Sequence, residues 1–469
     1  MARDIFPDDV FFLPKAEPIP VQPGTGPPLR GVWGVASKLP GGVLDRERLM
    51  ALKTLSPTIR MCEIFRPPMS LTGSQQKIFL RLLAALRPNW HTDTNLPAGI
   101  SELFAANRAF GSRDRRLYRE LIFTTLRFLP WIEPLLDTDP DRAAKAVAWL
   151  AADLPATRAY RAALCGDWPV CPAAVSAKAS HLGASPDVLL PAWLTRHCPE
   201  SAVVPNLDAL HTRAPLWLRL QTKDAARVIA EFSAKQWPTR RSAILPGALE
   251  VLAEADVTKS DAWTQGLIEV QDLGSQLILE SAGIAPGGRW LDACAGAGGK
   301  TLQLVALLGP KGHVDAHDVR ASALRELEIR ATRARATTIT VLPTLPATAN
   351  YDGVLVDAPC SGTGTWRRAP HLKWTTSAGQ VSTAAEKQVA LLTQFSDLVR
   401  PGGRLIYATC SLSRLENEDV VTAFLAARAE FKSEAAARPF EATPRSVGLA
   451  ILPAAHNTDG FYVASLRRT

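Results

Sequence analysis

Several features that would place this chain of 469 residues in a familiar class are missing from it. Its cysteines are scattered and form no CxxC pair, so their spacing predicts neither a disulfide framework nor a zinc site. No apolar run is long enough to cross a bilayer, and the acidic first residues lack the apolar core of a signal peptide. We therefore expect a cytoplasmic protein without a metal ion and without membrane contact.

The composition is that of a globular protein with a moderately basic charge. Hydrophobic residues make up 47% of the chain and charged residues 21%, which allows real cores to form. The formal net charge of +8 suits a polyanionic partner, although many proteins without such a partner carry as much. No basic tail concentrates this charge, so any nucleic-acid surface must be built by the fold.

The length predicts two or three domains, and changes in the residue pattern indicate where they begin. The N-terminal part is rich in proline and glycine, the next part has apolar residues at helical spacing, and a mixed texture follows. The predicted divisions are an extended or loosely packed segment at 1–73, an all-helical domain at 74–197, a linker or small α+β substrate-side subdomain at 198–284, and an α/β domain at 285–469.

Strands and helices alternate regularly in the last of these parts. That alternation predicts an α/β fold with a doubly wound parallel sheet. A final strand at 461–466 is expected at an antiparallel edge, and a strand at 216–220 followed by a helix at 223–235 is expected in the preceding part. The strands of the parallel sheet are predicted at 289–295, 313–319, 337–342, 351–358 and 404–410, with helices of ten or more residues between them.

A glycine-rich turn follows the first of these strands, within Asp292–Thr301. Small residues from Ala295 to Gly299 let the backbone turn sharply and let a ligand approach the main chain closely. A helix starting at this turn would direct its free N–H groups at an anionic group. The second strand ends in Asp318, where a carboxylate can bind a ribose diol. The pair favours an adenosine-bearing cofactor, and NAD stays open on these residues alone.

Two cysteines follow the ends of neighbouring predicted strands. Cys360 comes shortly after Asp357 at the end of the fourth strand, and Cys410 ends the fifth. Ligands of an open parallel sheet bind beyond the carboxyl ends of its strands, so both thiols should face the crevice that holds the glycine-rich turn. A lone strand cysteine is more often a small buried hydrophobe, but two of them beside a cofactor turn favour chemistry.

Methylation of cytosine at C5 is a reaction that needs thiols in such a place. C5 is a poor nucleophile until a thiolate adds to C6 and makes C5 enamine-like. An acid at Asp357 can hold a proton on ring N3, and positive charge at Lys300 can favour the thiolate. Methylation of exocyclic amines would instead use an Asp/Asn-Pro-Pro-aromatic sequence, which Asp357–Cys360 is not.

Several separated motifs carry a resemblance to a known family. They are Gln271–Gln276, Asp292–Thr301, Asp357–Gly364, Arg367–Arg368 with Lys373–Trp374, Thr409–Ser411 and Asp459–Phe461. Together they resemble the RsmB/Fmu (Sun) family of RNA 5-methylcytosine methyltransferases, over roughly Pro215 to the end of the chain. The resemblance implies a Rossmann-like domain with S-adenosylmethionine as cofactor, Cys410 as nucleophile and Cys360 as the group that aids product release. The cofactor pocket it implies is lined by Cys294, Ala295, Gly296, Ala297, Gly298, Gly299, Lys300, Asp318 and Asp357.

Arginines are concentrated between Arg108 and Arg127, where only Asp114 and Glu120 oppose them. By itself such a cluster is as readily a solvated helix face as a phosphate-binding one. The helical part resembles, more weakly, the NusB-like RNA-binding domain of the same family, with its best stretch at Ser112–Leu121, and this favours phosphate binding. The RNA-binding residues expected in all are Arg113, Arg115, Arg116, Arg119, Arg367 and Arg368.

Three positions depart from the family's pattern. The family usually carries an Asp after the third strand that contacts the cofactor base, and Leu342–Thr344 holds none. His371 stands where an acidic residue is common, and Gln221 replaces a usual Asn. The first departure concerns one cofactor contact and the other two concern substrate choice, whereas none touches the thiols.

The resemblance leads us to expect a monomeric enzyme that makes 5-methylcytosine in ribosomal RNA of the 16S type and so acts in rRNA processing. A transfer-RNA methyltransferase is one alternative, and a non-catalytic RNA-binding assembly factor on the same fold is another. A DNA cytosine methyltransferase would attack with the thiol of Cys360, which would leave Cys410 and the helical region unexplained.

Overall fold

The computed structural model describes residues 71–346 and 348–469. Of these, Phe79–Thr469 belong to one compact unit, whereas the first half of helix α1, up to Ile78, belongs to another. The predicted N-terminal segment at 1–73 lies outside the described residues except for its last three, which begin α1, and Cys62 lies outside them as well. In the part of the chain that the structure describes, no helix is both long enough and apolar enough to cross a membrane.

The described chain begins with a series of helices whose apolar faces pack together. In α1 the side chains of Leu82 and Leu86 are buried, and in α3 the side chains of Leu117 and Leu121 are buried too. The all-helical character predicted for this part is therefore confirmed. The helices are α1 (Leu71–Leu86), α2 (Leu96–Ala106), α3 (Ser112–Arg127), α4 (Leu129–Thr138), α5 (Pro140–Leu150), α6 (Arg158–Cys165), α7 (Val175–Leu182), α8 (Ala192–His197) and α9 (Asn206–Leu210).

A small antiparallel sheet follows, with its strands in the order β2-β3-β1-β4. Strand β1 has the bounds predicted for it, and the predicted helix after it is α10. Val228 and Phe232 on the apolar face of α10 are buried against Leu218 and Leu249 of the sheet, which holds the two layers together. The elements are β1 (Leu216–Leu220), α10 (Ala225–Ala234), β2 (Thr239–Arg241), β3 (Ala248–Val251), α11 (Asp261–Thr264) and β4 (Ile268–Val270).

The remaining strands form a larger sheet with a parallel core. Its path is β11-β12-β13-β9-β8-β5-β6-β7, and β5 to β9 in this path run parallel. The strand order reverses on either side of β5, and such a switch point is where open α/β sheets bind ligands. The strands are β5 (Gly288–Asp292), β6 (Gly312–His317), β7 (Ile339–Leu342), β8 (Tyr351–Asp357), β9 (Val399–Thr409), β10 (Phe431–Glu434), β11 (Thr443–Pro444), β12 (Leu449–Ile451) and β13 (Phe461–Arg468).

Two expectations about this sheet are wrong. The last strand is antiparallel as predicted but is not an edge, because β13 pairs with β9 on one side and with β10 and β12 on the other. Its residues Phe461–Leu466 are all buried, as an internal strand requires. A helix was also expected between every two parallel strands, but the described residues of the segment 343–350, which joins β7 to β8, contain none.

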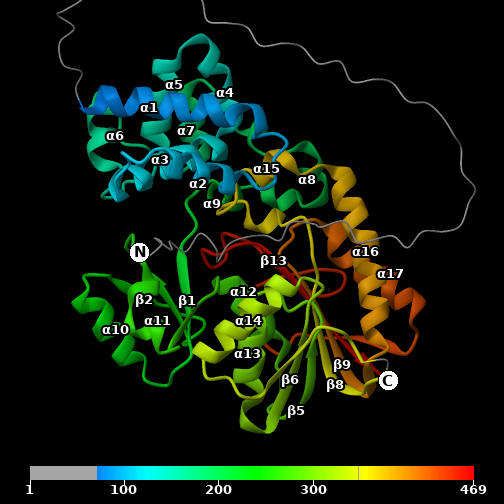
Figure 1. The fold of residues 1–469 in the computed structure, drawn as a ribbon. Coiled ribbons are helices and arrows are strands. Elements are labelled where there is room, and N and C mark those ends of the chain that lie inside the picture. Colours follow the sequence, from blue (N-terminus) through cyan, green and yellow to red (C-terminus); the bar gives the residue numbers. More distant parts are fainter. Residues whose placement is uncertain (1–70, 347) are drawn as a thin grey trace, which may run out of the picture. The chain divides into compact units, whose positions relative to one another are not determined.

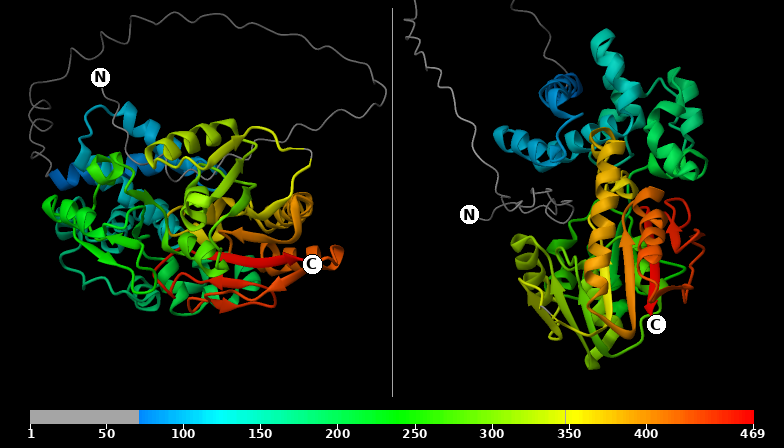
Figure 2. Two further views of the ribbon diagram at one scale, coloured as in Figure 1. Left: turned by 90° about the horizontal axis from the view of Figure 1, so that it is seen from below. Right: turned by 90° about the vertical axis from the view of Figure 1, so that its right-hand side faces the viewer.

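Helices cover both faces of the parallel strands. Side chains alternate along a strand, so Leu355 of β8 packs in the core under α12 and α13 while Val354 packs under α16 and α17. The two helix layers lie on opposite sides of the strands in Figure 1. In the right-hand view of Figure 2, the amber helix α16 lies in front of the strands. These helices are α12 (Leu273–Ala282), α13 (Gly299–Leu308), α14 (Ala321–Arg333), α16 (Ala378–Ser396) and α17 (Glu418–Ala427). The short helix α15 (Leu372–Thr375) instead contacts the end of α3, where Nε1 of Trp374 donates to the carbonyl of Leu126.

Candidate active site

The glycine-rich turn leaves β5 at Asp292 and enters α13 at Gly299. Gly296 and Gly298 have φ angles of +54° and +88°, in the left-handed region that glycine tolerates best. A Cβ atom on Gly298 would lie 2.7 Å from Cγ of Leu327, so a larger residue does not fit there. The turn therefore keeps large side chains away from the N-terminus of α13, the helix end that attracts negative charge.

Asp318 follows β6 and faces this turn. Its Oδ2 accepts hydrogen bonds from the N–H of Gly296 and from Nη2 of Arg320, both at 2.9 Å, while Oδ1 accepts from the N–H and Nε of Arg320. Burial alone would raise the pKa of Asp318, but these bonds outweigh it and hold the pKa below its usual value. Asp318 is thus an ionised acceptor beside the turn, and Arg320, which the sequence pattern did not single out, shares it.

Lys300 of α13 meets Asp357 at the end of β8. Its Nζ lies 2.8 Å from Oδ2 of Asp357, and the two side chains are 11% and 29% exposed. Burial lowers the pKa of Lys300, but the neighbouring Asp357 more than compensates, so the pKa lies above its usual value and the amine stays charged. Two predicted catalytic residues that are far apart in the sequence are therefore in direct contact.

The two predicted catalytic thiols lie side by side. Sγ of Cys360 is 3.3 Å from Sγ of Cys410, and both residues are half-buried. They meet because β8 and β9 are parallel neighbours in which Asp357 pairs with Ala408, so the residues that follow each strand emerge at the same edge. The hydrogen bond with Cys410 and burial raise the pKa of Cys360 well above its usual value, so Cys360 is a neutral thiol.

Two residues that the sequence reasoning missed support the loops behind these thiols. The carboxylate of Glu416 accepts hydrogen bonds from Ser361 and Ser411, and Gln388 of α16 donates to the same carboxylate. The only signal for Glu416 was an acidic residue shortly after Cys410, and no spacing rule links it to the loop of Cys360.

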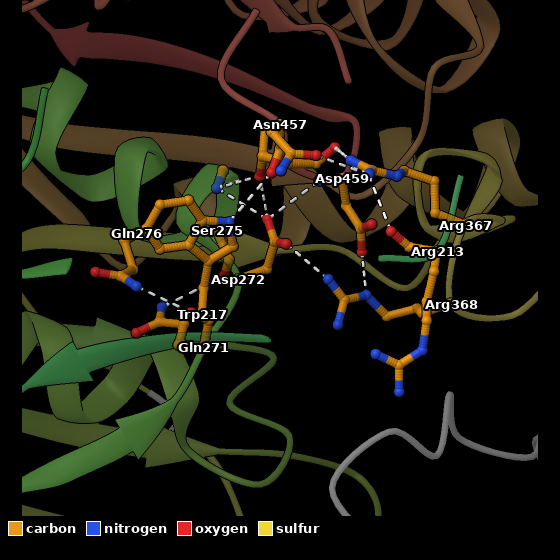
Figure 3. Close-up of polar contacts among 12 residues, drawn as sticks. Arg213, Trp217, Gln271, Asp272, Ser275, Gln276, Arg367, Arg368, Asn457 and Asp459 are labelled. Carbon is orange, nitrogen blue, oxygen red and sulfur yellow. Dashed lines mark hydrogen bonds and ion pairs between the residues drawn. The ribbon is translucent and has the colours of Figure 1, made fainter. Parts of the chain in front are cut away.

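Arg367 and Arg368 do not lie on an open surface. Arg368 forms ion pairs with Asp272, at 2.6 Å, and with Asp459, so three of the predicted motifs converge here (Figure 3). Burial raises the pKa of Asp459 to about 6, although Arg368 opposes this. Arg367 is 1% exposed and donates to the side-chain oxygen of Asn457. The structure contradicts the expected RNA contact for Arg367, because protein partners enclose its guanidinium, whereas RNA contact by Arg368 stays a prediction.

The other predicted RNA-binding arginines lie on the first half of α3. Arg113 and Arg116 are exposed, and Arg115 and Arg119 are partly exposed. Arg127, at the end of the helix, does not share this surface, because it is 5% exposed and donates to a backbone carbonyl of the α/β part. Burial lowers its pKa to about 10. The arginine surface that stays a candidate for RNA is therefore the N-terminal half of α3.

The three departures from the family's pattern are structurally distinct. His371 is 4% exposed and contacts a backbone carbonyl of the helical region, and burial lowers its pKa to about 4, so the imidazole stays neutral. Gln221 accepts a hydrogen bond from Arg219 at the end of β1. Leu342 ends β7 and offers its carbonyl to Nδ1 of His317, 2.9 Å away.

The residues at the switch point fit an adenosine-bearing cofactor. Gly296 has no other protein atom within 3.7 Å of the place where a Cβ would stand, so a ligand can approach its backbone. Asp318 supplies the acidic acceptor that ribose hydroxyls require, and to bind them it would exchange bonds with Arg320. Within residues 71–346 and 348–469, no group of three His, Cys, Asp or Glu side chains is placed to hold a metal ion.

Solved structures share the fold of this chain. PH0851 has a TM-score of 0.65 and 21% identity, with 86% of this chain and 99% of that chain covered. NSun6 from Pyrococcus horikoshii, solved with SFG, has a TM-score of 0.53 and 19% identity, with 59% and 98% covered. The sheet order, the glycine-rich turn and the acid after the second strand are those of the Rossmann-like methyltransferases that use S-adenosylmethionine.

Sequence comparison shows which family the chain is similar to. Residues 283–467 match the family model described as 16S rRNA methyltransferase RsmB/F. The ribosomal RNA small subunit methyltransferase B of Pasteurella multocida is 34% identical over 296 residues, which cover 60% of this chain and 65% of that protein. The chain thus spans just under two-thirds of the length of this relative. These matches confirm the resemblance to the RsmB/F family seen in the motifs, and the family model covers residues 283–467 of the chain.

Proposed function

We propose that this protein is an S-adenosylmethionine-dependent RNA methyltransferase that forms 5-methylcytosine in small-subunit ribosomal RNA. The observation that carries the proposal is the pair of thiols of Cys360 and Cys410, 3.3 Å apart beyond the ends of adjacent parallel strands. The choice of RNA rests on the name of the Pasteurella multocida relative, a small-subunit rRNA methyltransferase. Transfer RNA is the alternative target.

The chemistry of cytosine explains why two adjacent thiols are useful. C5 and C6 are bonded neighbours, so groups that serve them must lie side by side. The thiolate of Cys410 forms a bond to C6, and the electron pair of the C5=C6 bond makes C5 nucleophilic. Cys294–Lys300 and Asp318 would hold S-adenosylmethionine, whose sulfonium group would supply a methyl electrophile to C5 and keep the electron pair of the broken S–CH3 bond as a neutral thioether. The C5 proton is then lost to water, the C5=C6 bond re-forms, and Cys410 leaves with the electron pair of the S–C6 bond.

Cys360 aids the last of these steps as a neutral thiol. Its raised pKa keeps the S–H proton in place, and the sulfur of Cys410 lies within hydrogen-bond distance of it. The S–H group therefore stabilises the thiolate of Cys410 as it leaves C6, because a hydrogen bond to a charged acceptor is stronger than one to a neutral acceptor.

Lys300 and Asp357 serve the ring and the nucleophile. Negative charge builds up on the ring as the thiolate adds, and a proton held at N3 by Asp357 neutralises it. The charge of Lys300 interacts both with Asp357, 2.8 Å away, and with the sulfur of Cys410. Cys410 therefore attacks C6 beside the charge of Lys300.

Separate removal of the two thiols tests this proposal. Cys410→Ala should give neither methylated product nor a covalent RNA adduct. Cys360→Ala should still attack, release poorly, and accumulate a denaturant-resistant protein–RNA complex that requires S-adenosylmethionine. Cys171→Ala, in the helical region, is the matched control and should behave like the parent. Denaturing gels with small-subunit rRNA and transfer RNA from cells that lack the protein, together with mapping of 5-methylcytosine, measure both effects.

Other outcomes would point to other functions. Adducts in Cys410→Ala and none in Cys360→Ala would exchange the two roles, as in a DNA-type enzyme. RNA binding without methylation by the parent would favour the assembly factor. Methylation of transfer RNA alone would show that the substrate is transfer RNA and not ribosomal RNA.

A further inference from the structure

A single buried carboxylate joins the two loops that carry the thiols. Glu416 lies at the end of the 3-10 helix Arg414–Glu416, and its side chain is buried. Its Oε1 accepts the N–H of Ser361 at 2.8 Å, and its Oε2 accepts the hydroxyls of Ser361 and Ser411, the latter at 2.6 Å. Since these serines directly follow Cys360 and Cys410, Glu416 holds the neighbour of each thiol.

Other contacts fix the carboxylate itself. Nε2 of Gln388 donates to Oε1 of Glu416 at 3.2 Å and to the carbonyl of Pro359 at 2.9 Å. The hydroxyl of Tyr407 donates to the backbone carbonyl of Glu416 at 2.6 Å. Burial raises the pKa of Glu416, and the hydrogen bonds that it accepts offset part of that rise. The four bonds to its side chain come from two N–H groups on Oε1 and two serine hydroxyls on Oε2, and an ionised carboxylate accepts all four.

The same loops also touch each other directly. Oγ1 of Thr363 accepts the N–H of Leu412 at 2.7 Å, and the N–H of Gly364 donates to the carbonyl of Cys410 at 2.9 Å. A Cβ atom on Gly364 would lie 2.0 Å from the carbonyl oxygen of Gly460, so the approach requires glycine. These contacts hold the backbones of the two loops close to each other, while the carboxylate of Glu416 accepts hydrogen bonds from the residue that follows each cysteine.

We propose that Glu416 is a positioning residue that keeps the sulfurs of Cys360 and Cys410 adjacent by binding Ser361 and Ser411 at once. Its role in catalysis rests on the proposed function, since the thiols must cooperate on one ring for their separation to matter. Its role in geometry does not, because the separation of the sulfurs can be measured without RNA.

Phenylarsine oxide measures that geometry, because a trivalent arsenical binds tightly only where two thiols can reach one arsenic atom. The parent protein should bind one equivalent tightly, and Cys410→Ala should lose that binding. Glu416→Gln should weaken it about tenfold or more, because the hydroxyls of Ser361 and Ser411 lose a charged acceptor and hydrogen bonds to a neutral amide are weaker. Glu418→Gln, in the first turn of α17, makes the same substitution outside the loops and should bind like the parent.

Kinetics separate positioning from mere stability. Glu416→Gln should retain the parent's affinity for S-adenosylhomocysteine and for RNA but slow single-turnover methyl transfer about tenfold or more, so that kcat falls and KM does not. If Glu416→Gln does not fold, Ser361→Ala removes one hydroxyl contact and should weaken arsenical binding in the same direction. Folded variants that bind the arsenical and turn over like the parent would overturn the proposal. Tight arsenical binding by a parent that methylates no RNA would keep the positioning role and refute the function.

Discussion

The carboxyl of Asp292, at the end of β5, should make the stability of the methyltransferase domain depend on pH. The residue is 1% exposed, its Oδ2 accepts a hydrogen bond from Thr301 at 2.7 Å, and its Oδ1 has no hydrogen-bond partner among the described residues. Burial raises its pKa from 3.8 to about 7, and the bond from Thr301 opposes this only in part. The folded protein therefore binds this proton more tightly than the unfolded chain does.

The sign and the size of the effect follow from that difference. The stabilisation is fully present below about pH 4, and it is lost as the pH rises through about 7. The folded and unfolded pKa values differ by about three, and one pKa unit corresponds to about 1.36 kcal/mol. The contribution to the free energy of unfolding is therefore about 4 kcal/mol. Asp292→Asn removes the titration, but it buries an amide donor that costs about 1–3 kcal/mol at every pH. The variant should therefore be less stable than the parent at low pH and gain on it as the pH rises.

Hydrogen exchange of the amides of β5 is the assay, with parent and variant compared at matched pH so that the intrinsic exchange rates cancel. Between about pH 4 and pH 8 the ratio of the two exchange rates should change by about three powers of ten in favour of the variant. Asp352→Asn is the control, because contacts with Arg289 and Arg400 lower the pKa of that carboxyl and reverse the sign. A ratio that stays constant over this range would refute the argument for Asp292.

Two further substitutions test the ligand surfaces. Asp318→Ala should weaken binding of S-adenosylhomocysteine about tenfold or more in calorimetry, because the acceptor for the ribose hydroxyls is removed, and equal affinity would exclude Asp318 from the pocket. Arg115→Ala with Arg116→Ala should weaken RNA binding and flatten its log–log salt dependence by about 0.7–0.9 for each phosphate that the protein no longer binds. An unchanged slope would leave the N-terminal half of α3 as a solvated surface.

The parts of the site that the sequence predicts well are those set by strand ends. Cys360 and Cys410 each follow a buried apolar strand, and neighbouring parallel strands end at the same edge, so their meeting could be inferred without coordinates. The same logic applies to the glycine-rich turn and Asp318, which now share a hydrogen bond. Buried apolar runs in the sequence show where each strand ends, and the strand order then shows which of these ends are neighbours.

Contacts between distant loops could not be predicted in that way. The ion pairs of Arg368 with Asp272 and Asp459 were not foreseen, because these partners lie far from it in the sequence and no spacing rule joins the three. The internal place of β13 was missed for a related reason, because β10 and β12 are short and lack a strong alternating pattern. Such features depend on which loops a closed fold brings together, and single-sequence patterns do not encode that.

The helical region is tied to the loops that carry the thiols, and this bears on how RNA would reach them. Nδ1 of His197 in α8 lies 3.0 Å from Oγ of Ser413, in the loop after Cys410. Nζ of Lys373 donates to the carbonyl of Arg127 at 2.8 Å, at the end of α3.

The Lys373 contact holds the C-terminal end of α3, whereas the candidate phosphate-binding arginines lie on its N-terminal half. At 1.5 Å per residue the helix is about 24 Å long, so most of its length separates the first arginines from the Lys373 contact. On the proposed function, an RNA that spans both regions gains affinity from the arginines and reactivity from the thiols. The helical region would therefore select for extended RNA substrates without contacting the reacting base.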